Sequence, residues 1–594
     1  MLGIFHKRRA GILQDTPVTV NHAVGRNLRV ESARPLRNGL AMRPAAALLL
    51  PLLLSGLFFT GCASSASGPG EKTTPSTSAE DKPQYGGVFA STRLSSDPPS
   101  FDIHRESAID VITSTSANYG LIVRYAPLEE KVVPDLAERW EYSSDGKTVT
   151  FYLRKGVKFH NGDDLTSADV KFTLDRVRGA IAQGPGALAA PRKELLQAVD
   201  RVETPDDYTV ILRLLYPSAN LLNWVASPTN AVYDKKWVEA GHEPTKEVNG
   251  TGAFKFKEYI RGTSFELVKN DKYWNPELPY LEGVKSYIIP DTGTALAALK
   301  TGQLMIGSID EAQEPTVRPQ IESGELAATL RLVTTRQAGP AALVWLNNSR
   351  APFNDVRVRQ AVNLALYRQE ILRSKGTPRV GAVVFGWTLP GSYWALPAEE
   401  LAKIPGYGSD KAADRAQAKK LLADAGYPNG LNIKTFSRNQ QSSIDTVILY
   451  GAQLKTIGIN VDLQPVDVSV VNDRQRAHDF DLLIQRANAG TTEDPDTFFN
   501  QFYLCNAPRN YQVFCNPKFE DLNARQSQTL DPEARRKIVW EIEKYVLGEV
   551  VPVLPDSSLT PVLTAINKKV RGWAPHPSAG SYPAYRFDTV WLAK

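Results

Sequence analysis

A short apolar run that ends in a cysteine constrains this chain most, because it separates a leader from the part that can fold. Residues 45–59 are mostly Leu, Ala and Phe, with Arg43 just before them and Gly61-Cys62 soon after. A basic residue, an apolar stretch of this length and a small-residue ending are typical of a signal peptide. The run is too short to cross a hydrocarbon core of about 30 Å as a helix, which takes about 20 residues. The sequence therefore predicts a signal peptide over residues 42–61.

The end of this run also resembles a lipoprotein box, in which the cysteine becomes the lipidated first residue of the mature chain. The resemblance implies lipidation of Cys62 and anchoring at the outer face of the cytoplasmic membrane, towards the periplasmic space or cell surface. Phe59 departs from the Leu that usually stands three places before the cysteine. The alternative is a buried helix of the fold, but the low-complexity sequence after Cys62 disfavours it.

The basic character of the chain comes from its first residues. The formal net charge is +5, but of the 594 residues the first 61 carry eight basic and two acidic groups, so the remaining 533 have a net charge of −1. Residues 1–41 are polar, basic and without periodicity, and we interpret them as a non-native or removed extension, with translation starting at Met42. The charge therefore predicts no nucleic-acid partner and no membrane contact other than the lipid anchor.

The stretch that follows the lipidation site is predicted to be a disordered tether over residues 62–82. It consists mainly of Ser, Thr, Gly, Pro, Lys and Glu, with no large apolar side chain after Cys62. Such a composition buries too little surface to fold. A flexible chain of this length has a mean reach of roughly 25 Å, so the folded part can move near the membrane.

Two cysteines remain after lipidation of Cys62, and they lie close together in the sequence. Cys505 and Cys515 stand in a loop-like stretch, and outside the cytoplasm such a pair indicates a disulfide. The alternative is two free buried thiols. The seven His residues are scattered, and the sequence contains neither a CxxC nor an HExxH motif. It therefore predicts no metal site and no cofactor.

Helical and strand patterns alternate along the chain. Alternating apolar residues predict strands over 148–154 and 208–214, with Asp145-Gly146 as a hairpin turn before the first. Capping residues and apolar stripes predict three helices: 355–372 after Asn354, 411–425 between Asp410 and Gly426, and 532–545 after Asp531. No repeat of 20–50 residues is present. The sequence thus predicts an α/β or α+β protein of several lobes.

Three blocks stand in order along the chain: PDLAERW at 134–140, DG at 145–146 and LRKGVKFHNG at 153–162. They closely resemble the signature of the family 5 extracellular solute-binding proteins, the oligopeptide, dipeptide and nickel receptors of ABC importers. Further blocks recur in order: NGTGAF at 249–254, YWN at 273–275, IPD at 289–291, AALKTG at 297–302, PFNDVRVRQA at 352–361, AKKLLADAGY at 418–427 and QLKTIGI at 453–459. The resemblance spans roughly residues 85–573. Tyr367 departs from it, because the family usually has Asp before Arg368.

None of these blocks pairs a nucleophile with a base, so they specify a scaffold. We expect a turn at 159–162 and then a helix capped by Thr166 or Ser167, with His160 packed in the fold rather than acting as a base. Gly250 and Gly252 are expected where the chain turns tightly. No GK[ST] follows them, so they do not form a phosphate loop.

The family resemblance implies an α/β, periplasmic-binding-protein-like fold of two hinged lobes, class II, of the large type with an extra inserted subdomain. Lobe I is expected to comprise 83–127, 245–336 and 552–594, the inserted subdomain 128–244, and lobe II 337–551. The chain is expected to cross between lobes near 341–347 and 550–555. Two crossing strands would form a hinge, and a ligand contacted from both sides would stabilise the closed form.

The resemblance also implies where a ligand would bind. Dipeptide receptors carry an Arg near the position of Arg438 that receives the ligand carboxylate, and an Asp four residues before a Pro that pairs with the ligand ammonium. Here Thr491 stands at that second position, so an acidic or acceptor end is expected to be bound more firmly than an amine. The alternative for Arg438 is a surface arginine, and the alternative for Trp387 and Trp394 is packing within lobe II. The predicted ligand contacts are Arg438, Asn439, Thr491, Glu493, Asp494, Trp387, Trp394 and Arg486.

The function predicted from this resemblance is that of an extracytoplasmic receptor lipoprotein of an ABC importer. It would bind peptides or related small organic solutes as a monomer, and deliver them to permease and ATPase subunits without chemical change. A second hypothesis is a sensory or regulatory lipoprotein on the same fold. A third is a hydrolase that uses Glu493, Asp494 and Asp496 as paired carboxylates. Against the third, Asp494-Pro495-Asp496 is explained more simply as a turn and helix start.

Overall fold

The computed structural model describes residues 82–105, 109–127, 131–188, 196–310, 312–335, 342–374, 383–486, 494–507, 509–555, 558–559, 562–575 and 585–594. All of them belong to one compact unit of the chain, Thr77–Lys594. The predicted extension 1–41, the signal peptide 42–61 and Cys62 lie outside the described residues, as does nearly all of the tether. Those interpretations therefore stay predictions.

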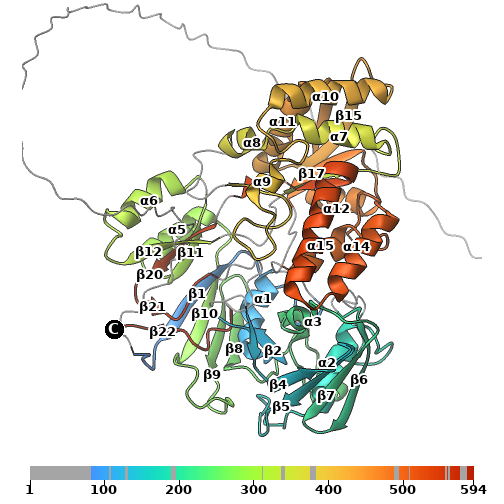
Figure 1. The fold of residues 1–594 in the computed structure, drawn as a ribbon. Coiled ribbons are helices and arrows are strands. Elements are labelled where there is room, and N and C mark those ends of the chain that lie inside the picture. Colours follow the sequence, from blue (N-terminus) through green and yellow to red (C-terminus); the bar gives the residue numbers. More distant parts are fainter. Residues whose placement is uncertain are drawn as a thin grey trace, which may run out of the picture. The chain divides into compact units, whose positions relative to one another are not determined.

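Two sheets are built from strands that lie far apart in the sequence (Figure 1). The four-stranded sheet has the order β1-β10-β9-β8, with bounds β1 Val88–Leu94, β8 Phe254–Ile260, β9 Ser264–Lys269 and β10 Gly283–Ile288. The three-stranded sheet has the order β11-β20-β12, with bounds β11 Ile306–Ile309, β12 Leu330–Thr335 and β20 Val562–Asn567. β1 is parallel to β10, and the other pairs are antiparallel.

Short helices and strands complete this part of the molecule. Their bounds are α1 Ile109–Thr115, η1 Ser116–Asn118, α5 Thr292–Lys300, α6 Glu314–Glu322, β21 Val570–Arg571 and β22 Trp591–Leu592. Leu299 of α5 and Val317 of α6 share a buried core with Leu563 of β20. The two helices therefore pack on the β11-β20-β12 sheet, whose central strand comes from the end of the chain.

A separate four-stranded antiparallel sheet, β4-β5-β7-β6, forms between residues 137 and 214. The elements of this region are β2 Val123–Tyr125, β3 Val132–Pro134, β4 Ala137–Tyr142, β5 Thr148–Leu153, α2 Ser167–Val177, β6 Val199–Asp206, β7 Thr209–Leu214, α3 Leu221–Val225, η3 Pro228–Asn230 and α4 Lys235–Glu239. The strands predicted at 148–154 and 208–214 are confirmed as β5 and β7. Gly146, at a φ of 68°, makes the predicted turn into β5.

The signature block at 153–162 leads into α2 as predicted. Thr166 caps this helix in a capping box with Asp169, whose side chain accepts from the Thr166 backbone N–H at 2.8 Å. His160 is packed in the fold, with its ring Nε2 3.1 Å from the carbonyl oxygen of Gly252. Burial lowers the pKa of His160 to about 4, so the ring is neutral near pH 7.

Gly250 and Gly252 are needed for a reason other than the predicted tight turn. Neither has a positive φ. Instead, a Cβ on Gly250 would lie 2.2 Å from the Asn118 carbonyl oxygen, and one on Gly252 would lie 2.3 Å from that of Ala117. Close approach of two backbones, rather than left-handed conformation, therefore requires these glycines.

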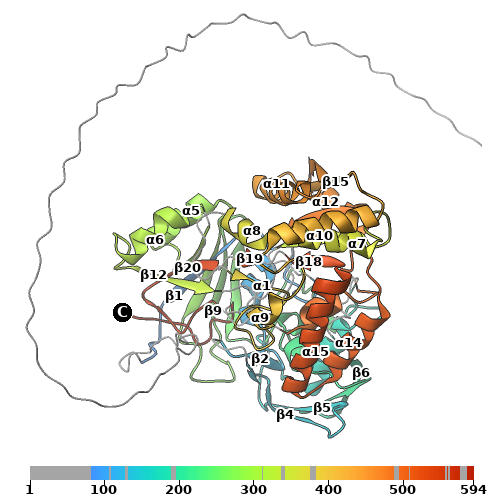
Figure 2. The ribbon, with the colours of Figure 1, turned by 45° about the horizontal axis from the view of Figure 1, so that its top comes forward.

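The region from residue 342 to 555 contains the sheet β17-β13-β18 and the parallel pair β15-β16 (Figures 1 and 2). Its strands are β13 Ala342–Leu346, β14 Val383–Val384, β15 Leu431–Arg438, β16 Ile459–Val466, β17 Leu482–Arg486 and β18 Val553–Pro555. Its helices are α7 Val356–Ala365, α8 Arg368–Ser374, α9 Ala398–Leu401, α10 Lys411–Asp424, α11 Gln441–Lys455, α12 Val468–Arg476, α13 Asp496–Phe502, α14 Pro517–Gln528, α15 Pro532–Lys544 and the π-helix η4 Tyr545–Val550.

Two of the three predicted helices are confirmed, and the third is wrong in its extent. α10 begins after Asp410, and α15 begins after Asp531. The helix predicted over 355–372 is instead two helices, α7 and α8, because Leu366 has an extended backbone and the Tyr367 N–H bonds to the Gln453 side chain at 2.8 Å. The cap of α7 is Asp355 rather than Asn354.

The two stretches where the chain was expected to cross between lobes are neighbouring buried strands. β13 and β18 pair antiparallel, with Leu343 opposite Pro555 and Trp345 opposite Val553. Along the chain, β12 precedes β13, and β18 is followed by β19 (Ser558–Leu559) and then β20. Since β12 and β20 are also antiparallel neighbours, with Thr335 opposite Val562, the chain passes between the two sheets twice at neighbouring positions.

Candidate functional site

Three of the predicted contacts cannot be judged from side-chain geometry. Thr491 and Glu493 lie outside the described residues. Arg486 is the last residue of β17, and its backbone is placed opposite Ala342 of β13. Its side chain belongs to the part of the chain that the structure leaves undescribed. The assignment of these residues to a ligand site therefore stays a prediction.

Arg438 and Asn439 lie at the carboxyl end of β15. Arg438 is paired with Val466 of β16 and its side chain is half-buried, while Asn439 is exposed and its N–H donates to the Val466 carbonyl at 2.8 Å. The Arg438 Nε atom is buried, and no acceptor among the described residues reaches it. A buried guanidinium N–H without an acceptor costs free energy.

The ends of β15 and β17 lie beside the last turn of α12. The Thr435 hydroxyl of β15 donates to the Leu482 carbonyl of β17 at 2.7 Å. Arg474 of α12 lies over the Phe436 ring at 5.2 Å, and the next residue, Gln475, accepts from the Gln485 side chain of β17 at 3.2 Å. The polar ends of the two strands thus meet at one edge of this region.

Asp494 is a structural anchor rather than an exposed ligand group. Its two carboxylate oxygens accept from the two terminal nitrogens of Arg535 on α15, each at 2.7 Å, and both side chains are almost fully buried. Asp494 also accepts from the backbone N–H of Asp496 at 3.0 Å, where α13 begins. The sequence Asp494-Pro495-Asp496 is therefore the turn and helix start that the simpler alternative describes.

Asp496 shares the same arginine but is less well neutralised. Its Oδ2 lies 3.4 Å from Arg535 Nη2, and its Oδ1 accepts from the Ser527 hydroxyl at 2.5 Å and from the Gln526 amide. Burial raises the pKa of Asp496; Arg535 opposes this shift, and the charge of Asp494 adds to it. One buried guanidinium thus serves two buried carboxylates.

The two predicted tryptophans have different environments. Trp394 is half-buried, and the Arg535 guanidinium lies 4.7 Å from its ring centroid, so the structure brings Trp394 and Asp494 together on one arginine. Trp387 is fully buried and packs against Phe498 and Tyr503 at 5.9 and 5.3 Å between centroids. The prediction of ligand stacking is corrected for Trp387, because its ring lies in the core of this region.

Glu543 is a buried acid that the sequence analysis missed. Its carboxylate accepts from the Trp387 N–H at 2.6 Å, the Thr388 N–H at 3.3 Å and the Thr388 hydroxyl at 3.0 Å. Burial raises the pKa of Glu543 to about 7, although these donors act in the opposite direction. A Cβ on Gly386 would lie 2.0 Å from Glu543 Oε1. A single Glu in a charged amphipathic helix gives no sequence signal for this role.

Cys505 and Cys515 are joined by a disulfide. The bridge connects the loop after α13 to the residue before the Asn516 cap of α14. The Cys505 N–H also donates to Glu520 on α14 at 2.7 Å. The loop that follows the Asp494 turn and α13 is thereby fastened to the helix that supplies Gln526 and Ser527.

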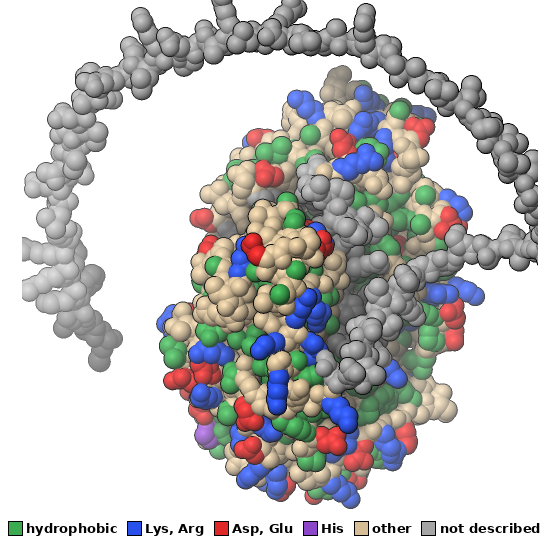
Figure 3. Space-filling view, turned by 90° about the vertical axis from the view of Figure 1, so that its left-hand side faces the viewer, with side chains coloured by type: hydrophobic (Ala, Val, Ile, Leu, Met, Phe, Trp, Pro, Cys, Tyr) green, Lys and Arg blue, Asp and Glu red, His purple; other side chains and the backbone are tan. Residues whose placement is uncertain are grey.

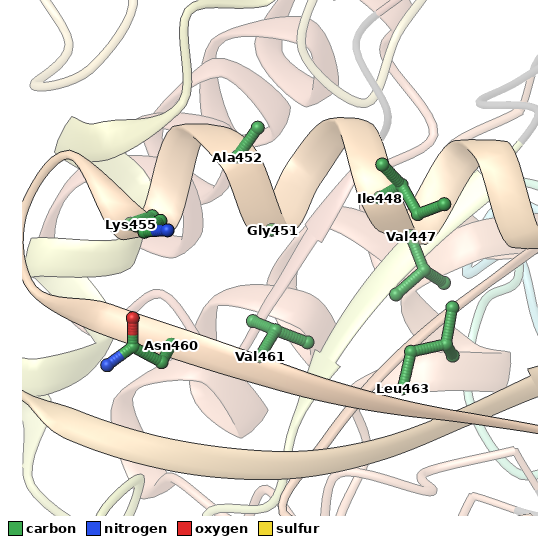
Figure 4. Close-up of a pocket in the computed structure, with 8 residues that line it drawn as sticks. All are labelled: Val447, Ile448, Gly451, Ala452, Lys455, Asn460, Val461 and Leu463. Carbon is green, nitrogen blue, oxygen red and sulfur yellow. The ribbon is translucent and has the colours of Figure 1, made fainter.

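A surface groove of about 330 Å³ lies between α11 and β16 and contains none of the predicted contacts (Figure 4). The lining side chains are Val447, Ile448, Gly451, Ala452, Lys455, Asn460, Val461 and Leu463. Lys455 is its one charged group, so the groove lacks the convergent polar groups of a solute site.

On the face drawn in Figure 3, basic and acidic described side chains are intermixed. Among the described residues, no group of three His, Cys, Asp or Glu is placed to hold a metal ion. Among the helices of the described ranges, none combines the length and apolarity that crossing a membrane requires.

Comparison with known proteins identifies the family. The model of the bacterial extracellular solute-binding proteins, family 5, middle part, matches residues 131–510. The chain belongs to this family. The family prediction and the two-lobe α/β fold are thereby confirmed. The family description places its members outside the cytoplasm.

Individual family 5 proteins are similar over most of their length. The periplasmic oligopeptide-binding protein OppA of Haemophilus influenzae is 27% identical over 499 residues, covering 80% of this chain and 87% of OppA. The ABC transporter-associated periplasmic binding protein DppA of Helicobacter pylori, solved with the peptide STSA, has a TM-score of 0.70 at 24% identity and covers 86% of this chain and 99% of its own. AgaA of A. tumefaciens R10, solved with agropinic acid, has a TM-score of 0.68 at 26% identity and covers 86% of this chain and 99% of its own.

Proposed function

We propose that this family 5 protein is the receptor subunit of an ABC importer, and that it binds peptides or related small organic solutes that carry an acidic end. The names of its relatives support this function, since OppA is an oligopeptide-binding protein and the DppA structure contains a peptide. The ligand would bind between the lobes, and contacts from both sides would favour closure about the strands β13 and β18.

The observation that carries the proposal is the half-buried guanidinium of Arg438. Its Nε atom is buried with no acceptor within the described ranges, at the edge where β15 and β17 end. The planar guanidinium fork matches a carboxylate and can bind it through two nitrogens. We therefore assign Arg438 to the carboxylate end of the solute, with exposed Asn439 beside it.

The amine end of a peptide would be held less strongly. Thr491 stands where the resemblance places an Asp for the ligand ammonium. Asp494 does not replace that Asp, because both its oxygens are bonded to Arg535. We propose that an amine is held through Glu493 or not at all, and that half-buried Trp394 borders the solute.

The remaining parts of the proposal concern location and partners. Lipidation of Cys62 would anchor the monomer to the outer face of the cytoplasmic membrane, where it would meet permease and ATPase subunits. The protein would not be an enzyme, since two of the three acids of the hydrolase hypothesis, Asp494 and Asp496, are both buried against Arg535. Replacement of Cys62 with serine is expected to release the protein from the membrane fraction.

Thermal melting in the presence of a tryptic casein digest tests solute binding. Preferential binding to the folded state raises the melting temperature, and native mass spectrometry of the complex identifies the peptides retained. Arg438→Ala is expected to weaken the affinity for the best peptide at least about tenfold, because a charge-assisted contact is lost.

The matched control is Arg476→Ala, which removes an exposed arginine from the end of the neighbouring helix α12. This variant is expected to bind like the wild type. Equal affinity of the Arg438→Ala variant and the wild type would contradict the carboxylate assignment. Absence of any peptide-dependent stabilisation of the wild type would contradict peptide binding itself.

A further inference from the structure

A noncovalent contact joins the predicted inserted subdomain to predicted lobe II. The N–H of Ala219, just before α3, donates to the carbonyl of Ser527 at the end of α14 at 2.9 Å. The side-chain amide of Asn223 donates to Asp494 Oδ2 at 3.5 Å. In one orientation the Asn220 amide accepts from Asn223 Nδ2 at 2.6 Å, and in the turned orientation it donates to the same Asp494 oxygen at 3.2 Å. Figure 1 shows α3 at the end of the α14–α15 pair.

These contacts lie far along the chain from the points where it crosses between the lobes. The segment with Asn220 and Asn223 returns to the lobe I side, where the Val232 N–H donates to the Gly120 carbonyl at 2.9 Å. Covalent connection to the region of Asp494 runs only through the links from β12 to β13 and from β18 to β20. Rotation about these links would separate the two sides of the α3 contact, because no covalent link holds them together.

The carboxylate of Asp494 is fixed before the asparagines reach it. Arg535 holds both oxygens, and the Asp496 N–H holds Oδ1. Oδ2 is therefore held in a set direction. An acceptor that is already ordered costs little further entropy when Asn220 and Asn223 dock on it.

The hairpin turn of the inserted subdomain borders the same corner. A Cβ on Gly146 would lie 2.8 Å from Leu530 Cδ1 and 3.2 Å from Pro217 Cβ. Leu530 stands between α14 and α15 and is 45% exposed. Close packing of the turn against Leu530 gives the asparagine contacts an apolar border.

We infer that Asn220 and Asn223 are positioning residues that latch the inserted subdomain onto the Asp494–Arg535 pair when the lobes close. They raise the affinity for solute by stabilising the closed form, without touching the solute. This inference rests on the proposed function, because a latch of this kind matters only to a receptor that closes on a ligand.

Spin-label distances test the latch directly. In a Cys62→Ser background, nitroxides at Asp207→Cys and Ala524→Cys report the separation of two exposed sites, one on each side of the contact. Pulsed electron resonance during titration with tryptic casein digest gives the fraction of molecules at the short distance. The Asn220→Ala/Asn223→Ala variant is expected to need about tenfold more digest for half-maximal closure, because hydrogen bonds to a charged acceptor are lost.

A control and a rescue separate positioning from general stability. Asn432→Ala removes an exposed amide of β15 whose Oδ1 accepts from Asn460 Nδ2, and it should leave the titration unchanged. Melting of the ligand-free asparagine variant should match the wild type. Asn223→Asp, which brings a second carboxylate towards Asp494, should shift the titration further than alanine does, and Asn223→Gln should restore part of the closure.

The outcomes distinguish the two proposals. If the labelled wild type keeps one distance at every digest concentration, both the proposed function and the latch are overturned. If the wild type closes and the asparagine variant closes at the same digest concentration, the latch alone is overturned. A tenfold shift with unchanged melting supports both.

Discussion

Two buried charge clusters use the same residue types but differ in the ratio of cations to anions. In the first, Arg586 bonds Asp135 at 2.6 Å and Arg124 bonds Asp588 at 2.8 Å, giving two arginines for two carboxylates. In the second, Arg535 serves both Asp494 and Asp496. Burial acts to raise the pKa of both Asp588 and Asp496. The two arginines nevertheless lower the pKa of Asp588, whereas the pKa of Asp496 is raised.

The difference teaches that burial alone does not set the charge state of these acids. Both Asp588 and Asp496 are almost fully buried. In the first cluster two arginines for two carboxylates outweigh desolvation at Asp588, whereas in the second a single arginine shared by two carboxylates does not outweigh it at Asp496. The balanced cluster joins the carboxy-terminal strand region to the start of the predicted inserted subdomain, while the unbalanced one lies where α3 meets predicted lobe II.

The largest expected effect is the loss of balance in the first cluster. Arg586→Met leaves Asp135 buried without its partner and should lower the free energy of unfolding by about 3–5 kcal/mol at pH 7. Urea unfolding followed by circular dichroism measures it. Arg525→Met, at an exposed arginine, should change stability by less than about 0.5 kcal/mol. Equal effects of the two substitutions would show that the buried cluster is not stabilised as described.

The second prediction concerns the free energy of unfolding when Asp588 or Asp496 loses its charge. Asp588→Asn removes a charge that two arginines hold and should cost about 3 kcal/mol of unfolding free energy at pH 7. Asp496→Asn removes a charge that is already disfavoured and should cost less than about 1 kcal/mol. The same urea experiment measures both variants. A larger loss for Asp496→Asn would reverse the comparison.

Glu543 extends the comparison to an acid whose hydrogen-bond donors, Trp387 and Thr388, are uncharged. Its folded pKa of about 7 exceeds the usual 4.5, so the native state binds the proton more tightly. The contribution to stability is complete below pH 4.5 and is lost as pH rises through 7. Between pH 5 and 7.5 the loss should be about 2 kcal/mol, at about 1.4 kcal/mol for each pKa unit.

Glu543→Gln should flatten that part of the stability profile, since glutamine does not titrate. Melting temperatures at several pH values from 5 to 8 measure the change. Glu541, on the same helix, is exposed and provides the control substitution Glu541→Gln, which should keep the wild-type profile. A profile unchanged by Glu543→Gln would refute the assignment of the pH dependence to this group.

Local patterns predicted a few elements of the fold correctly. The strands β5 and β7, the capping box at Thr166 and the starts of α10 and α15 depend on residues within a few positions of one another. The helix over 355–372 was predicted wrongly because its break depends on Gln453, a residue 86 positions away. The reason for Gly250 was likewise missed, since it depends on the backbone of Asn118.

The candidate site was less predictable than the fold. Sequence alone selected Arg438, whose buried Nε has no acceptor among the described residues, but it could not tell that Trp387 is core or that Asp494 is held by Arg535. An aromatic residue near Gly and Pro has the same local sequence whether it lines a cleft or fills a core. Glu543 and Asn223 carry no local signal at all.

By itself the sequence determined the family, the two-lobe α/β fold class and the placement of a few helices and strands, because ordered blocks and hydrophobic periods act over short distances along the chain. Only the tertiary structure decided which charges share a partner. Arg535 lies 41 residues from Asp494, and Arg586 lies 451 residues from Asp135. Electrostatic energy depends on separation in space and on burial, and neither is written in the local sequence.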